Sequence, residues 1–140
     1  MTMLPAVGTA PPPRWFGPID AQWARRYVEA AGDDNPLHRD AAAARAAGFA
    51  GPILPGMLLL GLAERAVRGW YPGWRIVHLS GQFLAPLCVP DSIAVSARVA
   101  RVEADAAPPR MVLRLFVRPA VDARMTACIG EAWLSPPPGG

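Results

Sequence analysis

The feature that most constrains the fold is a helix-forming stretch, residues 57–70, with the sequence MLLLGLAERAVRGW. Its apolar residues point to nearly all sides for two turns, and charges occur only at Glu64, Arg65 and Arg68. A helix that is hydrophobic around most of its circumference must be covered by other elements. We therefore predict a buried central helix, and the rest of the chain must supply its covering.

The chain after this helix reads as four strands separated by turns, at residues 76–84, 92–102, 110–118 and 124–134. The third is the clearest, because Met111, Leu113, Leu115 and Val117 alternate with a face that is at least half polar. Short turns between consecutive strands favour an antiparallel sheet. The predicted fold class is α+β, with an antiparallel sheet around one long apolar helix.

Two shorter helices are expected before the central one. Asp20 can cap a helix that runs to residue 31 and ends at Gly32, and Asp40 can cap a helix over residues 41–47 that ends at Gly48. The length of 140 residues predicts one domain, over residues 14–135. The Pro-rich residues 1–13 are predicted to form a flexible or extended arm on the domain, and residues 136–140 a frayed tail.

Composition excludes several classes of protein. The chain is 52% hydrophobic and 18% charged, as in compact globular domains. All 14 basic residues are arginine, and some could bind an anionic group, but no nucleic-acid-binding motif accompanies them. Cys88 and Cys128 lie in apolar runs and are predicted to be core thiols, and no metal-ligand spacing is present. No secretory leader or membrane-spanning run is visible, so we expect a cytoplasmic protein.

The sequence GDDNPLHRD at residues 32–40 is the candidate site. It places Asp33 and His38 five residues apart in a turn shaped by Asn35 and Pro36. An acid and an imidazole held together can share a water or a substrate proton. Gly56 opens the central helix, and a helix N-terminus can offer backbone N–H groups to a developing oxyanion.

Each of these residues has a simpler explanation when taken alone. Asp33 follows a helix end, and His38 could be an ordinary loop histidine satisfied by hydrogen bonds. Their joint spacing favours the catalytic interpretation. His78 shares a strand face with Ser80 and Gln82, which is compatible with a polar site or with a histidine in the core or at an interface.

The segments YVEAAGDDNPLHRD and GFAGPILPGML resemble the hydratase motif of the MaoC-like family, which includes (R)-specific enoyl-CoA hydratases and 3-hydroxyacyl-thioester dehydratases. The resemblance extends over residues 15–134 and implies the hotdog fold. It implies that Asp33 and His38 are the catalytic pair, that the N–H of Gly56 binds the thioester oxygen, and that Ser80 contacts the pair. It also implies a homodimer with CoA or an acyl-carrier arm at the subunit interface.

The implied reaction is the reversible syn hydration of a trans-2-enoyl thioester in fatty acid metabolism. It needs a base for water, a proton donor and a stabilised enolate oxygen, but no nicotinamide, flavin or metal cofactor. Two positions depart from the family pattern, Pro55 before the helix glycine and Ala31 before Gly32. Both could border the pocket and alter the substrate range.

Two other functions stay open at this point. In a hotdog thioesterase, a carboxylate on the central helix activates water, and Glu64 would be the candidate. The second alternative is a non-catalytic hotdog subunit of a heteromeric dehydratase.

The candidates for phosphate contacts are Arg75, Arg110 and Arg118.

Overall fold

The computed structural model describes residues 3–139 and contains the predicted helices and strands, with shifted ends. In chain order the elements are β1 (Arg14–Ile19), α1 (Ala21–Ala31), the 3₁₀ turn η1 (Pro36–His38), α2 (Ala41–Ala46), α3 (Gly56–Trp70), β2 (Arg75–Phe83), β3 (Asp91–Glu103), β4 (Arg110–Pro119) and β5 (Cys128–Ser135). The sequence did not predict β1, because its six residues RWFGPI contain Gly and Pro and show no clear alternation. Its strand character comes from pairing with β3.

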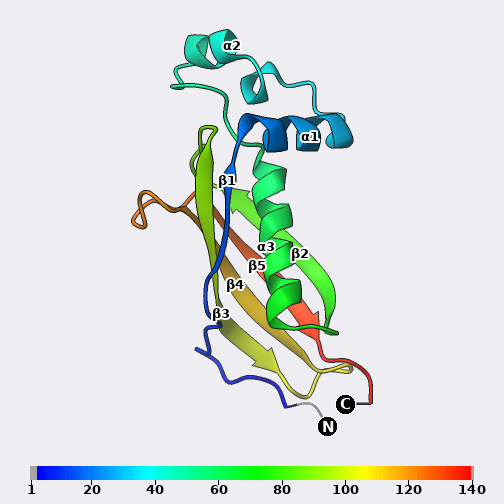
Figure 1. Cartoon of the computed structure of the whole chain (residues 1–140). Helices are drawn as coiled ribbons and strands as arrows, with labels where there is room; N and C mark the ends of the chain where they lie inside the picture. Colours follow the sequence, from blue (N-terminus) through cyan, green and yellow to red (C-terminus); the bar gives the residue numbers. More distant parts are fainter. Residues whose placement is uncertain (1–2, 140) are drawn as a thin grey trace.

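The five strands form one antiparallel sheet in the order β1-β3-β4-β5-β2. The strands β2 and β3 follow each other in sequence but are not neighbours, since β2 pairs with β5. The expectation of short turns between consecutive strands therefore does not hold for residues 86–91, which join two strands that are not paired. This connection carries the chain from the β2 edge towards the β3 side of the sheet (Figure 1).

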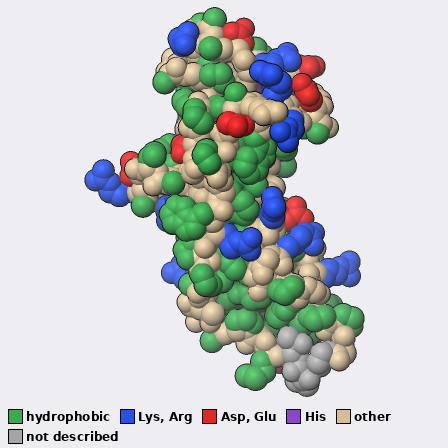
Figure 2. Space-filling view, viewed as in Figure 1, with side chains coloured by type: hydrophobic (Ala, Val, Ile, Leu, Met, Phe, Trp, Pro, Cys, Tyr) green, Lys and Arg blue, Asp and Glu red, His purple; other side chains and the backbone are tan. Residues whose placement is uncertain are grey.

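Helix α3 packs along one face of the curved sheet, which is the hotdog architecture (Figure 1). Its buried side chains are Leu58, Leu59, Leu60, Leu62, Ala63, Ala66 and Val67. They meet the inward-facing residues of the strands, including Val99 of β3 and Leu113 of β4, which have no exposed surface. The opposite side of α3 is open, and hydrophobic atoms are visible there between charged side chains (Figure 2).

The N-terminal arm is hydrogen-bonded to the domain at several points. The N–H of Gly8 donates to the carbonyl of Val99 (2.8 Å), and the N–H of Val99 donates to the carbonyl of Thr9 (2.9 Å). The indole N–H of Trp70 donates to the carbonyl of Pro12 at 2.8 Å. The arm thus extends this side of the sheet before the start of β1, alongside β3. Residues 1–2 of the predicted arm and residue 140 of the predicted tail lie outside the described residues.

The last strand begins at Cys128, four residues later than the predicted start at residue 124. A turn accounts for this difference, because Asp122 accepts hydrogen bonds from the N–H of Arg124 and of Met125.

Cys128 is fully buried as predicted, and its burial raises the pKa of its thiol. Cys88 is partly buried, and both cysteines are free. Within residues 3–139, no helix has the length and apolar character needed to cross a bilayer.

Candidate active site

The C-terminal end of α1 fixes the position of Asp33. Gly32 adopts the left-handed conformation (φ +67°), which favours glycine, and its N–H donates to the carbonyl of Glu29. The N–H of Asp33 donates to the carbonyl of Val28 at 3.0 Å. These two bonds form a Schellman motif. The motif stops the helix at a defined residue and leaves Asp33 at the start of the loop.

The next turn brings His38 back towards Asp33. The carboxylate of Asp33 accepts a hydrogen bond from the N–H of Asn35 at 3.0 Å, and the side-chain oxygen of Asn35 accepts one from the N–H of Leu37 at 3.1 Å. Asn35 is the N-cap of η1 and Pro36 is its first residue. As predicted, these two residues shape the turn. His38 is the last residue of η1, and its Nε2 lies 3.3 Å from Oδ2 of Asp33.

Both ring nitrogens of His38 face oxygen atoms. Nδ1 lies 2.9 Å from the carbonyl oxygen of Ile53. A carbonyl only accepts, so Nδ1 carries the hydrogen in this contact, and Nε2 is the nitrogen that can take up a proton beside the Asp33 carboxylate. The His38 side chain is 10% exposed and that of Asp33 is 32% exposed. The pair therefore consists of a nearly buried base and a carboxylate that solvent can reach.

The carbonyl that orients His38 is itself held from two sides. The N–H of Ile53 donates to the carbonyl of Leu37 at 2.9 Å, which ties this segment to η1. Ile53 also forms an isolated β-bridge with Cys88, and the N–H of Leu54 donates to the carbonyl of Leu87 at 2.7 Å. The His38 ring is therefore oriented by a backbone group that has little freedom to move.

The N-terminus of α3 offers backbone donors. Gly56 is the first helical residue, and the N-cap residue Pro55 makes no side-chain capping bond. The N–H groups of a first helical turn have no intrahelical acceptor, so those of Gly56 and Met57 remain available. A Cβ atom on Gly56 would lie 3.0 Å from three ring atoms of Phe83. Glycine thus leaves room for the Phe83 ring close to this amide.

His38 and Gly56 line the same cavity, whose volume is about 270 Å³. Its walls are apolar and combine three loops with α3; the other lining residues are Ile53, Leu54, Leu59, Phe83, Leu84, Ala85, Pro86, Leu87 and Ala127. Phe83 and Leu84 are about half exposed, at 47% and 50%, whereas Leu54, Leu59 and Leu87 are buried. The cavity therefore has an exposed apolar rim and a buried apolar wall. An imidazole and a helix N-terminus share it.

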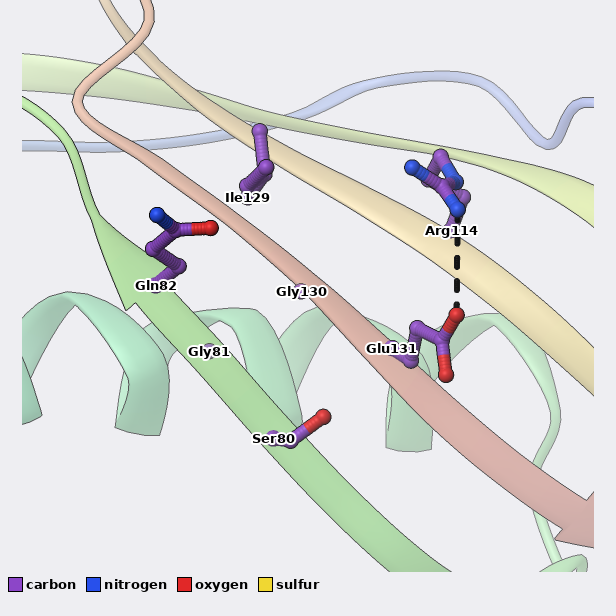
Figure 3. Close-up of a pocket in the computed structure, with 7 residues that line it drawn as sticks. All are labelled: Ser80, Gly81, Gln82, Arg114, Ile129, Gly130 and Glu131. Carbon is purple, nitrogen blue, oxygen red and sulfur yellow. Dashed lines mark ion pairs between the residues drawn. The ribbon is translucent and has the colours of Figure 1, made fainter.

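The structure does not bring Ser80 to this pair within one chain. Ser80 lines a different cavity, of about 240 Å³, together with Gln82, Arg114 and Glu131 (Figure 3). These side chains lie on the face of the sheet away from α3, which runs behind the strands in the figure. His78 lies on the same face, where its ring is 4.4 Å from that of Trp133. The prediction that His78, Ser80 and Gln82 share one face of their strand is confirmed.

Other residues singled out from the sequence lie away from the apolar cavity. Glu64 accepts hydrogen bonds from the guanidinium of Arg68. Arg110 pairs with Glu103, and Arg118 donates to the hydroxyl of Ser96 at 3.3 Å. Among residues 3–139 there is no cluster of three or more His, Cys, Asp or Glu side chains that could bind a metal ion.

The sequence did not indicate the contributions of Ile53 and Phe83 to the site. The role of Ile53 rests on its backbone carbonyl, which carries no residue-type signal. Phe83 ends β2 and meets α3 only after the chain has folded. Its position near the predicted end of a strand does not indicate that its ring lies close to Gly56.

Comparisons with known proteins identify the family and the fold of the chain. The model of the MaoC like domain matches residues 5–114. A segment of 69 residues is 36% identical to the mitochondrial 3-hydroxyacyl-[acyl-carrier-protein] dehydratase of Arabidopsis thaliana, and covers 49% of this chain and 42% of that protein. A similar protein of Solanum lycopersicum matches at 37% identity over 67 residues, 48% of this chain and 41% of that protein. The chain thus spans less than half the length of these plant relatives.

Solved structures show the same fold over nearly the whole chain. The (R)-hydratase from A. caviae involved in PHA biosynthesis superposes with a TM-score of 0.85 at 25% identity, over 97% of this chain and all of that one. The R-hydratase PhaJ1 from Pseudomonas aeruginosa gives a TM-score of 0.81 at 24% identity, over 94% of this chain and 82% of that one. A chain of the ChsH1-ChsH2 complex from Mycobacterium tuberculosis gives a TM-score of 0.79 at 20% identity, over 94% of this chain and 98% of that one. With the family model matching well over half of its length, the chain belongs to the MaoC-like domain family.

Proposed function

We propose that this protein is a hydro-lyase that adds water to trans-2-enoyl thioesters and forms (R)-3-hydroxyacyl thioesters, reversibly. The observation that carries the proposal is the arrangement at His38. Its Nδ1 is anchored on the carbonyl of Ile53, its Nε2 faces Asp33, and it borders an apolar cavity together with Gly56. This arrangement offers a base, an acid partner, an oxyanion donor and space for an acyl chain.

The reaction follows from these positions. A water that contacts both Nε2 of His38 and Oδ2 of Asp33 gives up one proton to the pair as its oxygen bonds to C3 of the substrate. The electrons of the double bond move towards the thioester carbonyl, whose oxygen becomes enolate-like and accepts a hydrogen bond from the N–H of Gly56. The pair then returns the proton to C2 on the same face, which completes a syn addition. Every atom of the water ends in the product and there is no net oxidation or reduction, so the reaction needs no nicotinamide or flavin.

The substrate class is inferred from the cavity and from the relatives. An apolar space of about 270 Å³ exceeds the roughly 150 Å³ that accommodates benzene, so a short or medium acyl chain would fit. The plant relatives are named for acyl-carrier-protein substrates, and the structural neighbours include R-hydratases. We propose an acyl thioester of fatty acid metabolism, carried on CoA or on a carrier protein. The cytoplasmic location stays a prediction from sequence.

The thioesterase alternative has less support. Glu64 lies on α3 as that mechanism would need, but its carboxylate is held by Arg68, 2.8 Å away, and it does not line the apolar cavity. A non-catalytic role would not require an oriented imidazole beside a carboxylate. Both alternatives give distinct outcomes in the assay below.

The test is an assay of the full chain with crotonyl-CoA and trans-2-octenoyl-CoA. We expect the absorbance of the conjugated thioester to fall without release of free thiol, and chiral analysis to identify the (R)-3-hydroxyacyl product. Release of thiol would instead identify a thioesterase. Saturable binding of the thioesters without turnover would identify a non-catalytic subunit. Either of these outcomes would replace the proposed function.

We also propose that the protein assembles as a homodimer through β2. This strand is at one edge of the sheet, and none of its nine residues is buried. An exposed edge strand presents unpaired backbone groups that can pair with a second copy. The apolar cavity reaches the end of the same strand at Phe83, so a partner on β2 would lie close to the cavity rim.

Replacing Val77 by glutamate tests this assembly. Val77 is 42% exposed on β2, and a glutamate there would place a charge against the second copy, where burying an unpaired carboxylate is costly. We expect sedimentation analysis to give a dimer of the 14.9 kDa chain for the wild type and a monomer for Val77→Glu. The matched control is Val121→Glu, since Val121 is 87% exposed outside the strands. A dimeric Val77→Glu variant would contradict the β2 interface.

A further inference from the structure

The face of the sheet away from α3, called the outer face below, carries two arginines directly opposite each other. The register pairs Arg98 of β3 with Arg114 of β4. Their neighbours Val99, Leu113 and Leu115 are buried against α3, so by strand alternation the two arginines project from the other face. Like charges directly opposite on neighbouring strands destabilise a sheet. The pair is therefore a local cost to folding unless something neutralises it.

Nearby carboxylates neutralise this pair only in part. Nη2 of Arg114 lies 3.7 Å from Oε1 of Glu131 on β5, which is a long distance for an ion pair (Figure 3). Arg98 has no carboxylate within 4.0 Å among residues 3–139. The remaining acid on this face, Glu103, is shared by two other arginines of the face, and its hydrogen bond with Arg110 lowers its pKa.

The two arginines also line a hollow. A cavity of about 350 Å³ is lined by Arg98, Val99, Ala100 and Arg114 of the sheet and by Val7 and Gly8 of the N-terminal arm. The paired bonds between the arm and Val99 hold this wall in place. Arg114 in addition borders the cavity of Figure 3. Two arginines from opposite positions of β3 and β4 therefore line one concave site, and within residues 3–139 Arg98 has no carboxylate to pair with.

We propose that the hollow between Arg98 and Arg114 binds a phosphate group. Guanidinium groups present forked N–H donors that match phosphate oxygens. A bound dianion would also replace the repulsion between the two arginines by two attractions. The site is on the face opposite α3, separate from the catalytic pair, and the proposal does not depend on the enoyl-thioester reaction.

The first test measures thermal unfolding and calorimetric titration of the full chain with inorganic phosphate, against sodium chloride at equal ionic strength. We expect phosphate to raise the Tm of the wild type more than chloride does. Arg98→Ser should lose this specific rise and weaken binding at least tenfold. In buffer without phosphate, the same variant should melt about 1 to 5 °C higher, because the like-charge contact is gone.

Two controls make the result specific. Arg124→Ser removes an arginine that is 95% exposed outside the strands, and it should leave the phosphate response unchanged. Arg98→Glu should also abolish the response while pairing with Arg114. The proposal is overturned if phosphate acts no differently from chloride, or if Arg98→Ser keeps the wild-type response.

A second titration identifies the source of the phosphate. Adenosine 3′,5′-bisphosphate that binds at least tenfold more tightly than inorganic phosphate would assign the site to a nucleotide phosphate, and equal affinities would assign it to free phosphate. Because both titrations measure binding without turnover, they can be repeated on His38→Ala. Absence of phosphate binding would not contradict the proposed hydratase activity, and absence of the activity would not contradict the phosphate site.

Discussion

Replacing His38 by alanine is expected to lower kcat/KM for enoyl-thioester hydration by about 10² to 10⁴-fold, the usual contribution of a positioned acid-base group. The variant removes the Nε2 atom that faces Asp33 and the Nδ1 contact with the carbonyl of Ile53. Asp33→Asn should cause a loss of similar order, because the neutral amide keeps the shape but not the charge. The measurement is the initial rate with crotonyl-CoA over a range of concentrations.

The chain offers matched controls for both changes. His78 is the only other histidine, and it packs on Trp133 on the far face of the sheet, so His78→Ala should keep nearly full activity. Asp34 is the exposed neighbour of Asp33, and Asp34→Asn should do the same. If the two catalytic groups act on one water, the double variant should lose little more than either single variant. Activity of His38→Ala within threefold of wild type, in a folded protein, would contradict the assignment.

A proline at position 56 is expected to lower kcat by about 10² to 10³-fold relative to an alanine there, the cost of losing one oxyanion donor. Proline removes the backbone N–H but is well tolerated at the first position of a helix, which Gly56 occupies. The extended backbone of Pro55 (φ −60°, ψ 132°) is also compatible with a following proline. Gly56→Pro therefore tests the donor while the helix is retained.

The comparison with Gly56→Ala separates chemistry from steric effects. Both variants place a Cβ about 3.0 Å from the half-exposed ring of Phe83, so both force a similar adjustment of that ring. Only the proline lacks the N–H. We expect kcat to differ between the two variants and their Tm values to be similar. Equal kcat values would show that the Gly56 amide does not bind the thioester oxygen.

Much of the candidate site could be predicted because its residues are close in sequence. The turn from Gly32 to His38 is encoded locally: glycine ends α1, Asn35 caps η1, and Pro36 starts it. These residues depend on their own backbone preferences, so the meeting of Asp33 and His38 follows from a short stretch of chain. The capping roles of Asp20 and Asp40 were predicted on the same grounds and are confirmed.

Contacts between distant segments could not be predicted in this way. Ile53 orients His38 through a carbonyl, and Phe83 reaches Gly56 from the end of β2. Ser80 was expected near the pair, but the alternation of β2 turns its side chain to the outer face, since its neighbour Leu79 pairs with the buried Ala132. Which face a strand residue occupies depends on register, and one position changes it.

By itself, the sequence determined the elements that rest on local preference and periodicity: the capped helices, the apolar helix α3, the strand character of β2 to β5, and the turn that joins Asp33 to His38. Only the tertiary structure decided the strand order, with β2 beside β5, and the pairing that makes RWFGPI a strand. It also decided which side chains share the cavity of His38 and which arginines meet on the outer face. Hydrogen bonding between strands is satisfied by many pairings, and the choice among them depends on packing across the whole core, which no short segment of sequence specifies.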